Sequence, residues 1–562
     1  MRRFPEILNE LINQDEEKAT RDLQKLYDEG YRSIAIALVH SYLYPIHEQR
    51  VEAIARQIGF EQISVSSSLQ AMINLVSRGG SATADAYLTP EVKRYLNGFS
   101  KGFIGGLSAE NGCRTSFMQS DGALCDHRSF SGLKAILSGP AGGVVGFAKT
   151  SYDPRDGSPV VGFDMGGTST DVSRFGGKYE HVFETTTAGV TIQTPQLDIN
   201  TVAAGGGSIL SYRNGLLAVG PESAGAHPGP ACYRKGGPLT VTDANVFLGR
   251  IHIDSFPKIF GPTEDQPLDY DIVKSKFEAL TRMVNSENKS NLTPAQVAAG
   301  FIDVANASMG RPIRALTEQR GFRTGAHILA CFGGAGGQHA CALAGVLGIP
   351  RVIVHKYSSL LSAFGMALAD VAVENSEPFN NRSYSQEVIP AVEERFVALE
   401  GLGREQLLSQ GIPKTAIRFE RYLNLRYRGS DTRIMIQKPD DGDFAASFVK
   451  RHKREFAFNL EVPIDIDTIR VRAAGLGEQG DHPSPFVKDL EALPEVPIAK
   501  DAHFATNEIF FEQEGKFITS PLYRLDTLAP GTAISGPAVL LDQTQTILLH
   551  PQNKARILTN CV

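Results

Sequence analysis

The sequence predicts an α/β fold in which helices cover a parallel sheet. Between residues 16 and 66, two helix-type apolar repeats alternate with two short apolar runs. That order is typical of parallel strands joined by covering helices. Further along the chain, two apolar runs at 160–165 and 327–332 each lead directly into a glycine-rich turn. Such turns let the backbone approach a ligand at the end of a strand.

The first 140 residues read as one α/β lobe. Helices are expected over 16–29, 51–58 and 82–99, and strands over 34–39 and 63–66. The lobe opens on a helix with no strand ahead of it, and an amphipathic helix needs a sheet to pack on. We therefore expect an incomplete first lobe, with an exposed apolar face around Leu23, Leu26 and Ile36.

The central stretch runs from Val160 to Asp171 and reads VVGFDMGGTSTD. A buried strand delivers Asp164 into a Gly-Gly turn, where successive N–H groups can form a concavity for phosphate oxygens. The hydroxyls at 168–170 can add donors. Asp164 and Asp171 would repel phosphate, so Mg²⁺ or a positioned water is needed between them. The simpler alternative is a β-hairpin turn with a surface aspartate.

Two more glycine runs follow this stretch, at 205–207 and 333–337, and the second is preceded by a strand and followed by a helix. From about residue 376 the chain turns into a charged helical segment and then short β segments. We expect three consecutive domains: the first lobe at 1–140, a nucleotide-binding domain at 141–375 and a β-rich domain at 376–562.

Composition limits the classes of partner. Of the 562 residues, 42% are hydrophobic and 21% charged, as in ordinary globular proteins. The net charge of −6, without a long basic run, argues against nucleic acid and anionic membrane as partners. No apolar run approaches the ~20 residues of a membrane span, and the N-terminus has no signal-peptide pattern. We expect a cytosolic protein.

The six cysteines are dispersed and form no C-x-x-C pair. A disulfide framework or a structural zinc site is therefore not expected, and we predict reduced thiols.

Taken together, the motifs resemble the hydantoinase A/5-oxoprolinase family, within the sugar kinase–actin–chaperone ATPase superfamily. The segments that carry the resemblance are SGPAGG at 138–143, FDMGGTSTDV at 163–172, DINTVAAGGGS at 198–208, GPESAGAHPGPACY at 220–233, TDAN at 242–245 and FGGAGGQH at 332–339. Details such as the Ala226-His227 pair and residues 234–237 are most similar to the eukaryotic 5-oxoprolinase members.

The resemblance implies a two-lobed ATPase fold with an incomplete first lobe, followed by the β-rich domain. It also implies ATP and Mg²⁺ as cofactors and a set of site residues. The catalytic residues would be Asp164, Thr168 and Asp171, with Asp164 as a metal ligand. The nucleotide would contact Gly166, Gly167, Thr170, Gly205, Gly206, Gly207, Gly333, Gly334, Gly336 and Gly337.

In this family ATP phosphorylates the amide oxygen of a cyclic amide, 5-oxo-L-proline, and water then opens the ring to give glutamate, a step of glutathione metabolism. The sequence departs from the family pattern in two places. It lacks an Asp-x-Gly-Gly-Thr turn before residue 140, and it lacks the hydantoinase B-like half, which we expect as a partner in cis or in trans, in a homodimer or hetero-oligomer. Turnover by this chain alone is not expected.

Two alternatives remain open. The chain could serve a hydantoinase or a ketone carboxylase as the ATPase subunit, because these enzymes share the phosphoryl activation of a carbonyl-type oxygen. It could also be a nucleotide-binding remnant without turnover.

Overall fold

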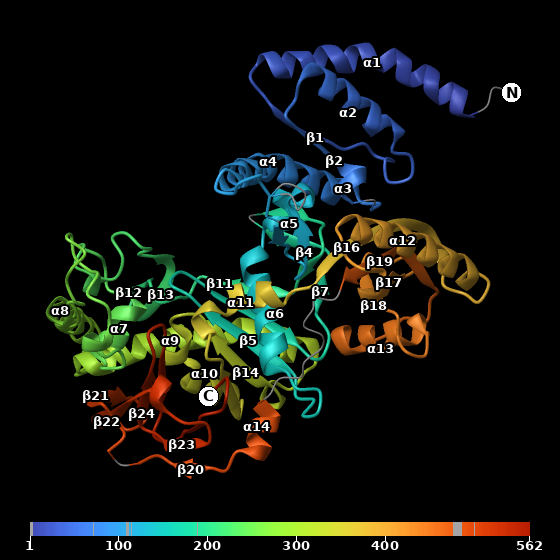
Figure 1. Cartoon of the computed structure of the whole chain (residues 1–562). Helices are drawn as coiled ribbons and strands as arrows, with labels where there is room; N and C mark the ends of the chain where they lie inside the picture. Colours follow the sequence, from blue (N-terminus) through green and yellow to red (C-terminus); the bar gives the residue numbers. More distant parts are fainter. Residues whose placement is uncertain are drawn as a thin grey trace. The chain divides into compact units, whose positions relative to one another are not determined.

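The computed structural model describes residues 4–70, 72–107, 112–113, 115–187, 189–475, 486–499 and 501–562 (Figure 1). The chain divides into two compact units, each assembled from three segments. Unit 1 contains residues 1–141, 181–197 and 369–480, and unit 2 contains residues 142–180, 198–368 and 481–562.

This division differs from the three consecutive domains that we expected. The segment 376–562 does not form one β-rich domain, because its first part belongs to unit 1 and its last part to unit 2. The reason lies in strand pairing. Strand β16 (Val371–Ser383) pairs in parallel with β4 (Leu124–Asp126), so the later segment completes a sheet begun far upstream.

Unit 1 begins with alternating helices and strands, as predicted. The elements are α1 (Phe4–Asp28), β1 (Ser33–Ile36), α2 (Ile46–Ile58), β2 (Gln62–Val65), α3 (Ser66–Leu69) and α4 (Leu75–Ser100). Strands β1 and β2 pair in parallel. Helix α2 ends at Gly59, whose φ of 110° is the left-handed conformation in which glycine commonly stops a helix. The two strands lie between α1–α2 and α4 (Figure 1).

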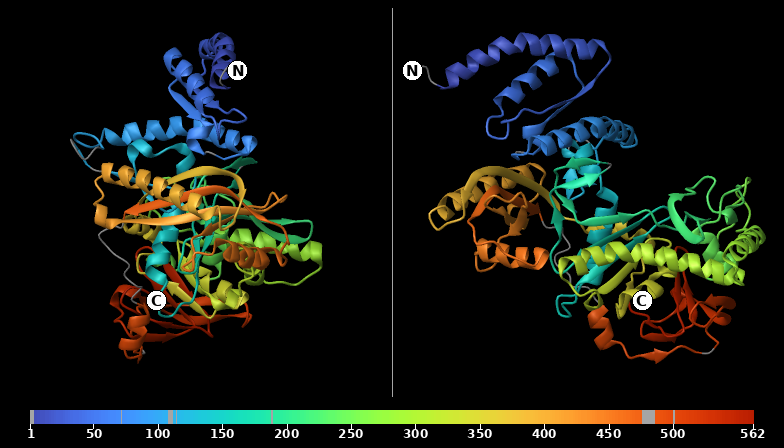
Figure 2. Two further views of the ribbon diagram at one scale, coloured as in Figure 1. Left: turned by 90° about the vertical axis from the view of Figure 1, so that its right-hand side faces the viewer. Right: turned by 180° about the vertical axis from the view of Figure 1, so that it is seen from behind.

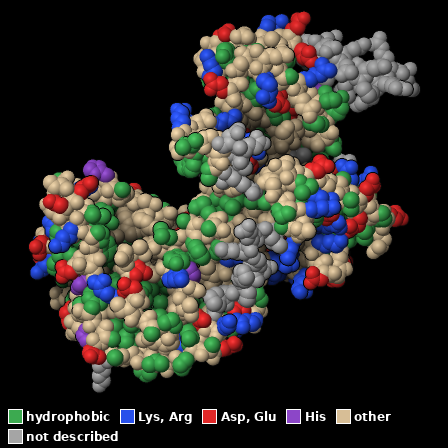
Figure 3. All heavy atoms as spheres, in the orientation of Figure 1, with side chains coloured by type: hydrophobic (Ala, Val, Ile, Leu, Met, Phe, Trp, Pro, Cys, Tyr) green, Lys and Arg blue, Asp and Glu red, His purple; other side chains and the backbone are tan. Residues whose placement is uncertain are grey.

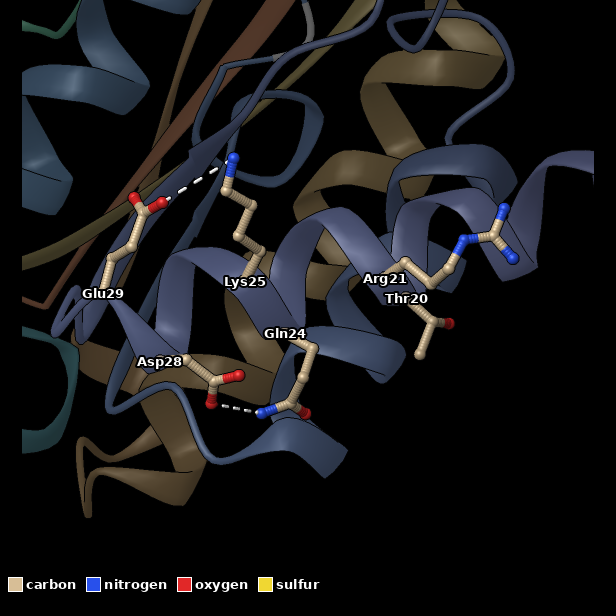
Figure 4. Close-up of a pocket in the computed structure, with 6 residues that line it drawn as sticks. All are labelled: Thr20, Arg21, Gln24, Lys25, Asp28 and Glu29. Carbon is tan, nitrogen blue, oxygen red and sulfur yellow. Dashed lines mark hydrogen bonds and ion pairs between the residues drawn. The ribbon is translucent and has the colours of Figure 1, made fainter.

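The predicted apolar exposure near the N-terminus is only partly present. Leu26 is 38% exposed, but Ile36 is only 6% exposed because β1 is covered by α4. The outer side of α1 is polar instead. Gln24 donates to Asp28 (2.9 Å) and Lys25 lies 3.8 Å from Glu29, both at i,i+4 spacing (Figure 4). Such exposed pairs add only a few tenths of a kcal/mol each, about 0.3–0.5.

A buried arginine joins the elements of this lobe. Arg78, in the first turns of α4, donates to the Ser66 hydroxyl (2.9 Å) and the Ser41 hydroxyl (3.1 Å). Glu48 of α2 accepts from the same Ser66 hydroxyl (2.7 Å) and from the Leu38 amide (2.8 Å). Because both charged groups are buried, loss of either would leave an uncompensated charge in the interior.

The second sheet of unit 1 has six strands in the order β18-β17-β19-β16-β4-β3. All of its pairings are antiparallel except β16–β4. The other strands of this sheet are β3 (Ser116–Met118), β17 (Ile417–Tyr427), β18 (Ile434–Gln437) and β19 (Ile464–Gly475). The helices of this part of unit 1 are α5 (Gly132–Ala135), α12 (Ile389–Ser409) and α13 (Phe444–Phe456). Helix α12 lies along β19 and β16 in each view (Figures 1 and 2). Short strands β7 (His181–Val182), β8 (Thr185–Thr187), β9 (Val190–Ile192) and β10 (Gln196–Leu197) complete the unit.

Unit 2 is built on a five-stranded sheet in the order β11-β6-β5-β14-β15. Its strands are β5 (Val160–Met165), β6 (Thr170–Phe175), β11 (Ile199–Val202), β14 (Ile328–Phe332) and β15 (Arg351–Val354). Strands β5, β14 and β15 run parallel, whereas β5, β6 and β11 pair antiparallel. The sheet is therefore mixed, because the glycine turn after β5 folds the chain straight back as a hairpin.

Helices cover both faces of this sheet. On one face, α6 (Ser138–Ser151) lies so close to β5 that a Cβ at Gly162 would overlap the Phe147 ring, and α11 (Leu361–Leu368) packs on α6. On the other face lie α9 (Pro294–Leu316) and α10 (Ala340–Leu347). Strand β5 is the middle strand and is almost wholly buried, so its end is rigidly placed.

The rest of unit 2 surrounds the α9 side. It comprises the hairpin β12 (Ser208–Arg213) and β13 (Leu216–Ser223), the helices α7 (Val241–Phe247), α8 (Tyr270–Asn288) and α14 (Phe486–Ala492), and two small C-terminal sheets, β21-β22-β24-β25 and β20-β23-β26. Their strands are β20 (Val496–Pro497), β21 (Ala505–Phe511), β22 (Lys516–Arg524), β23 (Thr532–Ser535), β24 (Ala538–Leu541), β25 (Thr546–Leu549) and β26 (Lys554–Arg556).

Two expectations about the whole chain can be compared with the structure. No disulfide joins cysteines in the described residues, and burial raises the pKa of the Cys125 thiol to about 12. Within the same residues, no helix is both long and apolar enough to cross a membrane. On the face shown in Figure 3, basic side chains stand among acidic and polar ones.

Candidate functional site

Two aspartates face each other where β5 and β6 meet the glycine turn. Asp164 and Asp171 are directly paired residues of this hairpin, and Thr201 of β11 is paired with Asp171 on the other side. Paired residues of neighbouring strands project to the same face of a sheet. The Thr201 hydroxyl donates to Asp171 Oδ1 (2.5 Å), so Asp164, Asp171 and Thr201 form one row.

The other flank of Asp164 is a glycine. Gly333, just after β14, has a φ of 80°, and a Cβ there would overlap both Asp164 Oδ1 and the Met165 carbonyl. Only glycine fits this conformation and this spacing. The Ser362 hydroxyl lies 3.5 Å from Asp164 Oδ2, at the outer limit of a hydrogen bond.

The electrostatics of the row favour a bound cation. Burial, and secondly the charge of Asp171, raise the pKa of Asp164 to about 6, while Ser362 opposes the shift. Burial also raises the pKa of Asp171, and its bond with Thr201 opposes this. In the part of the chain that the structure describes, neither carboxylate belongs to an ion pair. Two close carboxylates without a counter-charge are a natural place for a divalent cation.

The donor set fits Mg²⁺ better than a metal held wholly by protein. Among the described residues there is no group of three or more His, Cys, Asp or Glu side chains that could hold a metal. Mg²⁺ is commonly bound by one or two carboxylates while waters and phosphate oxygens fill its other positions. The Asp164–Asp171 pair matches that pattern.

The turn between the two aspartates is hydrogen-bonded to a second glycine run, residues 205–207. Gly206 N–H donates to the Gly166 carbonyl (3.0 Å), and Gly207 N–H donates to the Gly167 carbonyl (2.6 Å). A Cβ at Gly205 would lie 2.8 Å from the Gly166 oxygen. This close backbone packing fixes the turn, and it leaves Gly167 and Thr168 exposed at its tip.

Several predicted site residues lie elsewhere. Thr170 is fully buried, and its hydroxyl donates to the Ala204 carbonyl (2.6 Å) on the α9 side of the sheet. Gly336 packs on the Cys331 sulfur and Gly337 on the Thr546 carbonyl, and both are buried. Gly334, in contrast, has open space where a Cβ would be. The structure thus brings Asp164, Asp171, the 166–168 turn and residues 333–334 together.

The TDAN segment has a supporting role that the sequence did not reveal. Asp243 accepts from the Thr240 amide (2.8 Å) and hydroxyl (2.9 Å), closing a capping box at the start of α7. It also accepts from the Ala231 amide (3.0 Å) and the Cys232 amide (2.8 Å). The Thr242 amide donates to the Gly206 carbonyl (2.8 Å). Asp243 therefore stabilises the segment that contacts the second glycine run.

A buried histidine fixes the neighbouring helices. His339 lies between Asn245 (3.1 Å) and Asn306 (2.8 Å) and is completely buried. Burial lowers its pKa to about 3, so the imidazole is neutral at ordinary pH. It orients α7 and α9 and has no role as a charged group. Sequence reasoning did not identify Thr201, Ser362 or Asn306; of these only Thr201 lies in a family motif.

The hydantoinase/oxoprolinase family model matches residues 78–375, and the models for the N-terminal region and the C-terminal domain of the same family match residues 4–59 and 470–560. The chain belongs to the hydantoinase/oxoprolinase family. The resemblance inferred from the glycine motifs is thereby confirmed.

The curated relatives in this family include 5-oxoprolinases of eukaryotes. The chain is 50% identical to the 5-oxoprolinase of Saccharomyces cerevisiae, over 98% of this chain and 43% of that protein. It is 47% identical to 5-oxoprolinase 1 of Arabidopsis thaliana, over 95% of this chain and 42% of that protein. The chain therefore spans less than half the length of these relatives.

A solved structure supports the fold. The ATP-dependent caprolactamase from Pseudomonas jessenii has a TM-score of 0.81 at 25% identity, covering 98% of this chain and 79% of that one. The predicted α/β fold class is therefore confirmed.

Proposed function

We propose that this hydantoinase/oxoprolinase chain is the ATP-binding, lactam-activating half of a 5-oxoprolinase. The observation that carries the proposal is the Asp164–Asp171 pair, which flanks an exposed glycine turn and has no counter-charge in the described residues. The identity to eukaryotic 5-oxoprolinases over nearly the whole chain supports the choice of substrate, 5-oxo-L-proline.

The residues of the site would divide the work of holding Mg²⁺ and ATP. Asp164 and Asp171 would bind the cation, directly or through water, and Mg²⁺ would neutralise charge on the phosphates. Backbone N–H groups at 166–168 and the Thr168 hydroxyl would orient the phosphates. Gly205, Gly206 and Gly207 would keep that turn in place, and residues 333–334 would leave room for the nucleotide.

The chemistry explains why an ATP site is needed. An unstrained five-membered lactam resists hydrolysis, because amide resonance makes its carbonyl carbon a weak electrophile and its ring nitrogen is a poor leaving group. Transfer of the γ-phosphoryl group to the amide oxygen would release ADP and make the carbonyl carbon more electrophilic. Attack by water would then break the C–N bond to give an acyl phosphate, and a second water would release phosphate and glutamate. Positioning and charge stabilisation are the main contributions of a protein to such a transfer. We expect a hydantoinase B-like half to supply the hydrolytic part, in cis or in trans.

The similarity to caprolactamase gives a second candidate, a different cyclic amide with the same activation step. Assays should therefore compare 5-oxo-L-proline, hydantoin and caprolactam as separate substrates. The expected order places 5-oxo-L-proline first.

The test has two stages. Titration calorimetry of the chain with Mg²⁺ and a non-hydrolysable ATP analogue should detect one saturable site. Addition of a hydantoinase B-like half should then give ADP and glutamate formation that depends on 5-oxo-L-proline. Nucleotide binding without any lactam-dependent ADP release would favour a non-catalytic nucleotide-binding module, and absence of nucleotide binding would contradict the proposal.

A further inference from the structure

A polar cavity of about 710 Å³ lies within unit 1, separate from the aspartate row in unit 2. Its wall comes from the segments 67–70, 119–134, 194–195, 372–376 and 406–410. These segments include β4, α5, β16 and α12, all labelled in Figure 1. The volume falls in the ~300–1,000 Å³ range of small-molecule sites.

Most of the charged groups on this wall are already neutralised by the protein. Asp126 accepts from the Arg128 guanidinium (2.8 Å), which lowers the pKa of the aspartate against the effect of its burial. Glu374 forms an ion pair with the buried Arg470. Asn375 donates to Gln406 (3.0 Å), so these two amide side chains of the wall are hydrogen-bonded to each other.

Two opposite charges on the wall remain outside any ion pair in the described residues. The Lys134 ammonium donates to the Ser129 carbonyl (3.1 Å), and no carboxylate of the described residues lies within 4.0 Å of it. Asp121 is only 8% exposed, and one of its oxygens accepts from the Ala123 amide (3.0 Å). A carboxylate that is buried to this extent usually has a cationic partner or a bound ligand.

The backbone brings together the two segments that carry these charges. Ser120 N–H donates to the Lys134 carbonyl (2.8 Å), and the Ser120 hydroxyl donates to the same carbonyl (2.8 Å). Ser120 therefore holds Lys134 next to the chain at Asp121, yet the two side chains do not form an ion pair. A molecule that carries both a negative group and an N–H group would match these two charges of the cavity wall.

We propose that this cavity binds a small molecule of the amino-acid class, with its carboxylate at Lys134 and its ammonium or amide N–H at Asp121. The polar wall of serine, glutamine and asparagine side chains suits such a ligand and disfavours an apolar one. The volume accommodates an amino acid with bound water or a short peptide. The proposal does not rest on the nucleotide site, because the cavity lies wholly within the other unit.

Calorimetry on the whole chain without nucleotide tests this proposal. The probes are L-glutamate, 5-oxo-L-proline and glycyl-L-glutamate, with glutarate and propylamine as ligands that lack either the N–H group or the carboxylate. We expect saturable binding of at least one of the first three and at least tenfold weaker binding of the last two. Stronger binding of L-glutamate than of 5-oxo-L-proline would identify an ammonium at Asp121, and the reverse order would identify a lactam N–H.

Variants sharpen the test. Lys134→Gln and Asp121→Asn should each weaken binding about tenfold or more, and Asp121→Asn keeps an oxygen for the Ala123 amide, so the turn should still fold. Lys25→Gln on α1, where Lys25 is exposed, is the matched control and should leave binding unchanged. Asp164→Asn should affect nucleotide only. The proposal is overturned if none of the amino-acid probes binds at millimolar concentration, or if folded Lys134→Gln and Asp121→Asn bind as tightly as the original chain.

Discussion

Two aspartates in unit 2 differ in how the protein treats their oxygens. Asp243 is completely buried and accepts four hydrogen bonds from residues 231, 232 and 240. Asp164 is also largely buried, but it has one long contact with Ser362 and a second carboxylate opposite it. Asp243, whose oxygens accept four hydrogen bonds, stabilises the fold. The Asp164–Asp171 pair accepts few hydrogen bonds, so its oxygens can bind a cation. The predictions below test this difference.

The largest effect is expected for Asp164→Asn. Removing a cation-facing charge should lower Mg²⁺-dependent nucleotide hydrolysis in the complete enzyme about a thousandfold. The melting temperature should stay the same or rise, because no packed side chain is lost and a buried charge disappears. Asp254→Asn, an exposed aspartate of the same unit, is the control. Full hydrolysis by Asp164→Asn would remove this residue from the site.

Asp243→Ala should have the opposite profile. It removes a capping box and leaves three backbone amides and one hydroxyl without their acceptor, so we expect the free energy of unfolding to fall by about 3 kcal/mol or more. Denaturant unfolding measures the loss. If Asp243→Ala kept its stability and lost only nucleotide binding, Asp243 would belong with Asp164 as a site residue.

Gly333→Ala should affect both the stability of the fold and nucleotide binding. The added Cβ would overlap Asp164 Oδ1 at a φ of 80°, so we expect a loss of about 1–3 kcal/mol in stability together with weaker nucleotide binding. Gly345→Ala is the matched control, because Gly345 lies in α10 with open space around it. That substitution should leave stability unchanged or slightly higher. Equal behaviour of the two variants would show that Gly333 tolerates a side chain.

The smallest effect is a dependence on pH. With a pKa of about 6, Asp164 is ionised above that pH and protonated below it. Mg²⁺ binding should therefore weaken as pH falls below 6, by up to about tenfold per unit. Without Mg²⁺ the sign is reversed: the raised pKa means that ionisation of Asp164 lowers stability as pH rises from about 4 to 6. Mg²⁺ titrations between pH 5 and 8 check this, and an affinity that does not change with pH would contradict it.

The sequence predicted the features that depend on neighbouring residues. A buried run followed by Gly-Gly was enough to place Asp164 at the end of a strand, and the hairpin that was considered as the simpler alternative is indeed present. Thr170 was expected to face phosphate, but the strand begins at Thr170, so alternation along β6 turns it away from the Asp171 face. The first residue of a strand is hard to identify from sequence.

Features that depend on distant residues could not be predicted. The bond between Thr201 and Asp171 joins residues 30 apart and needs the register of β11. The parallel pairing of Leu124 with Val371 joins residues that are still farther apart in the sequence. It connects the segment 369–480 to the first segment of unit 1, so the chain divides into two units and not into the three consecutive domains that we expected. Local patterns carry no information about which strands pair over such separations.

The interleaving has a consequence for synthesis on the ribosome. Strand β4, at Leu124, pairs with β16, which is synthesised later. Strand β16 pairs in turn with β19, which ends at Gly475. About 350 residues separate these points, and translation at roughly 5–20 residues per second needs about 20–70 s to make them. During that interval the sheet of unit 1 has an unpaired edge, the kind of surface that chaperones protect. A nascent chain stalled just before β16 should therefore remain protease-sensitive within residues 116–126.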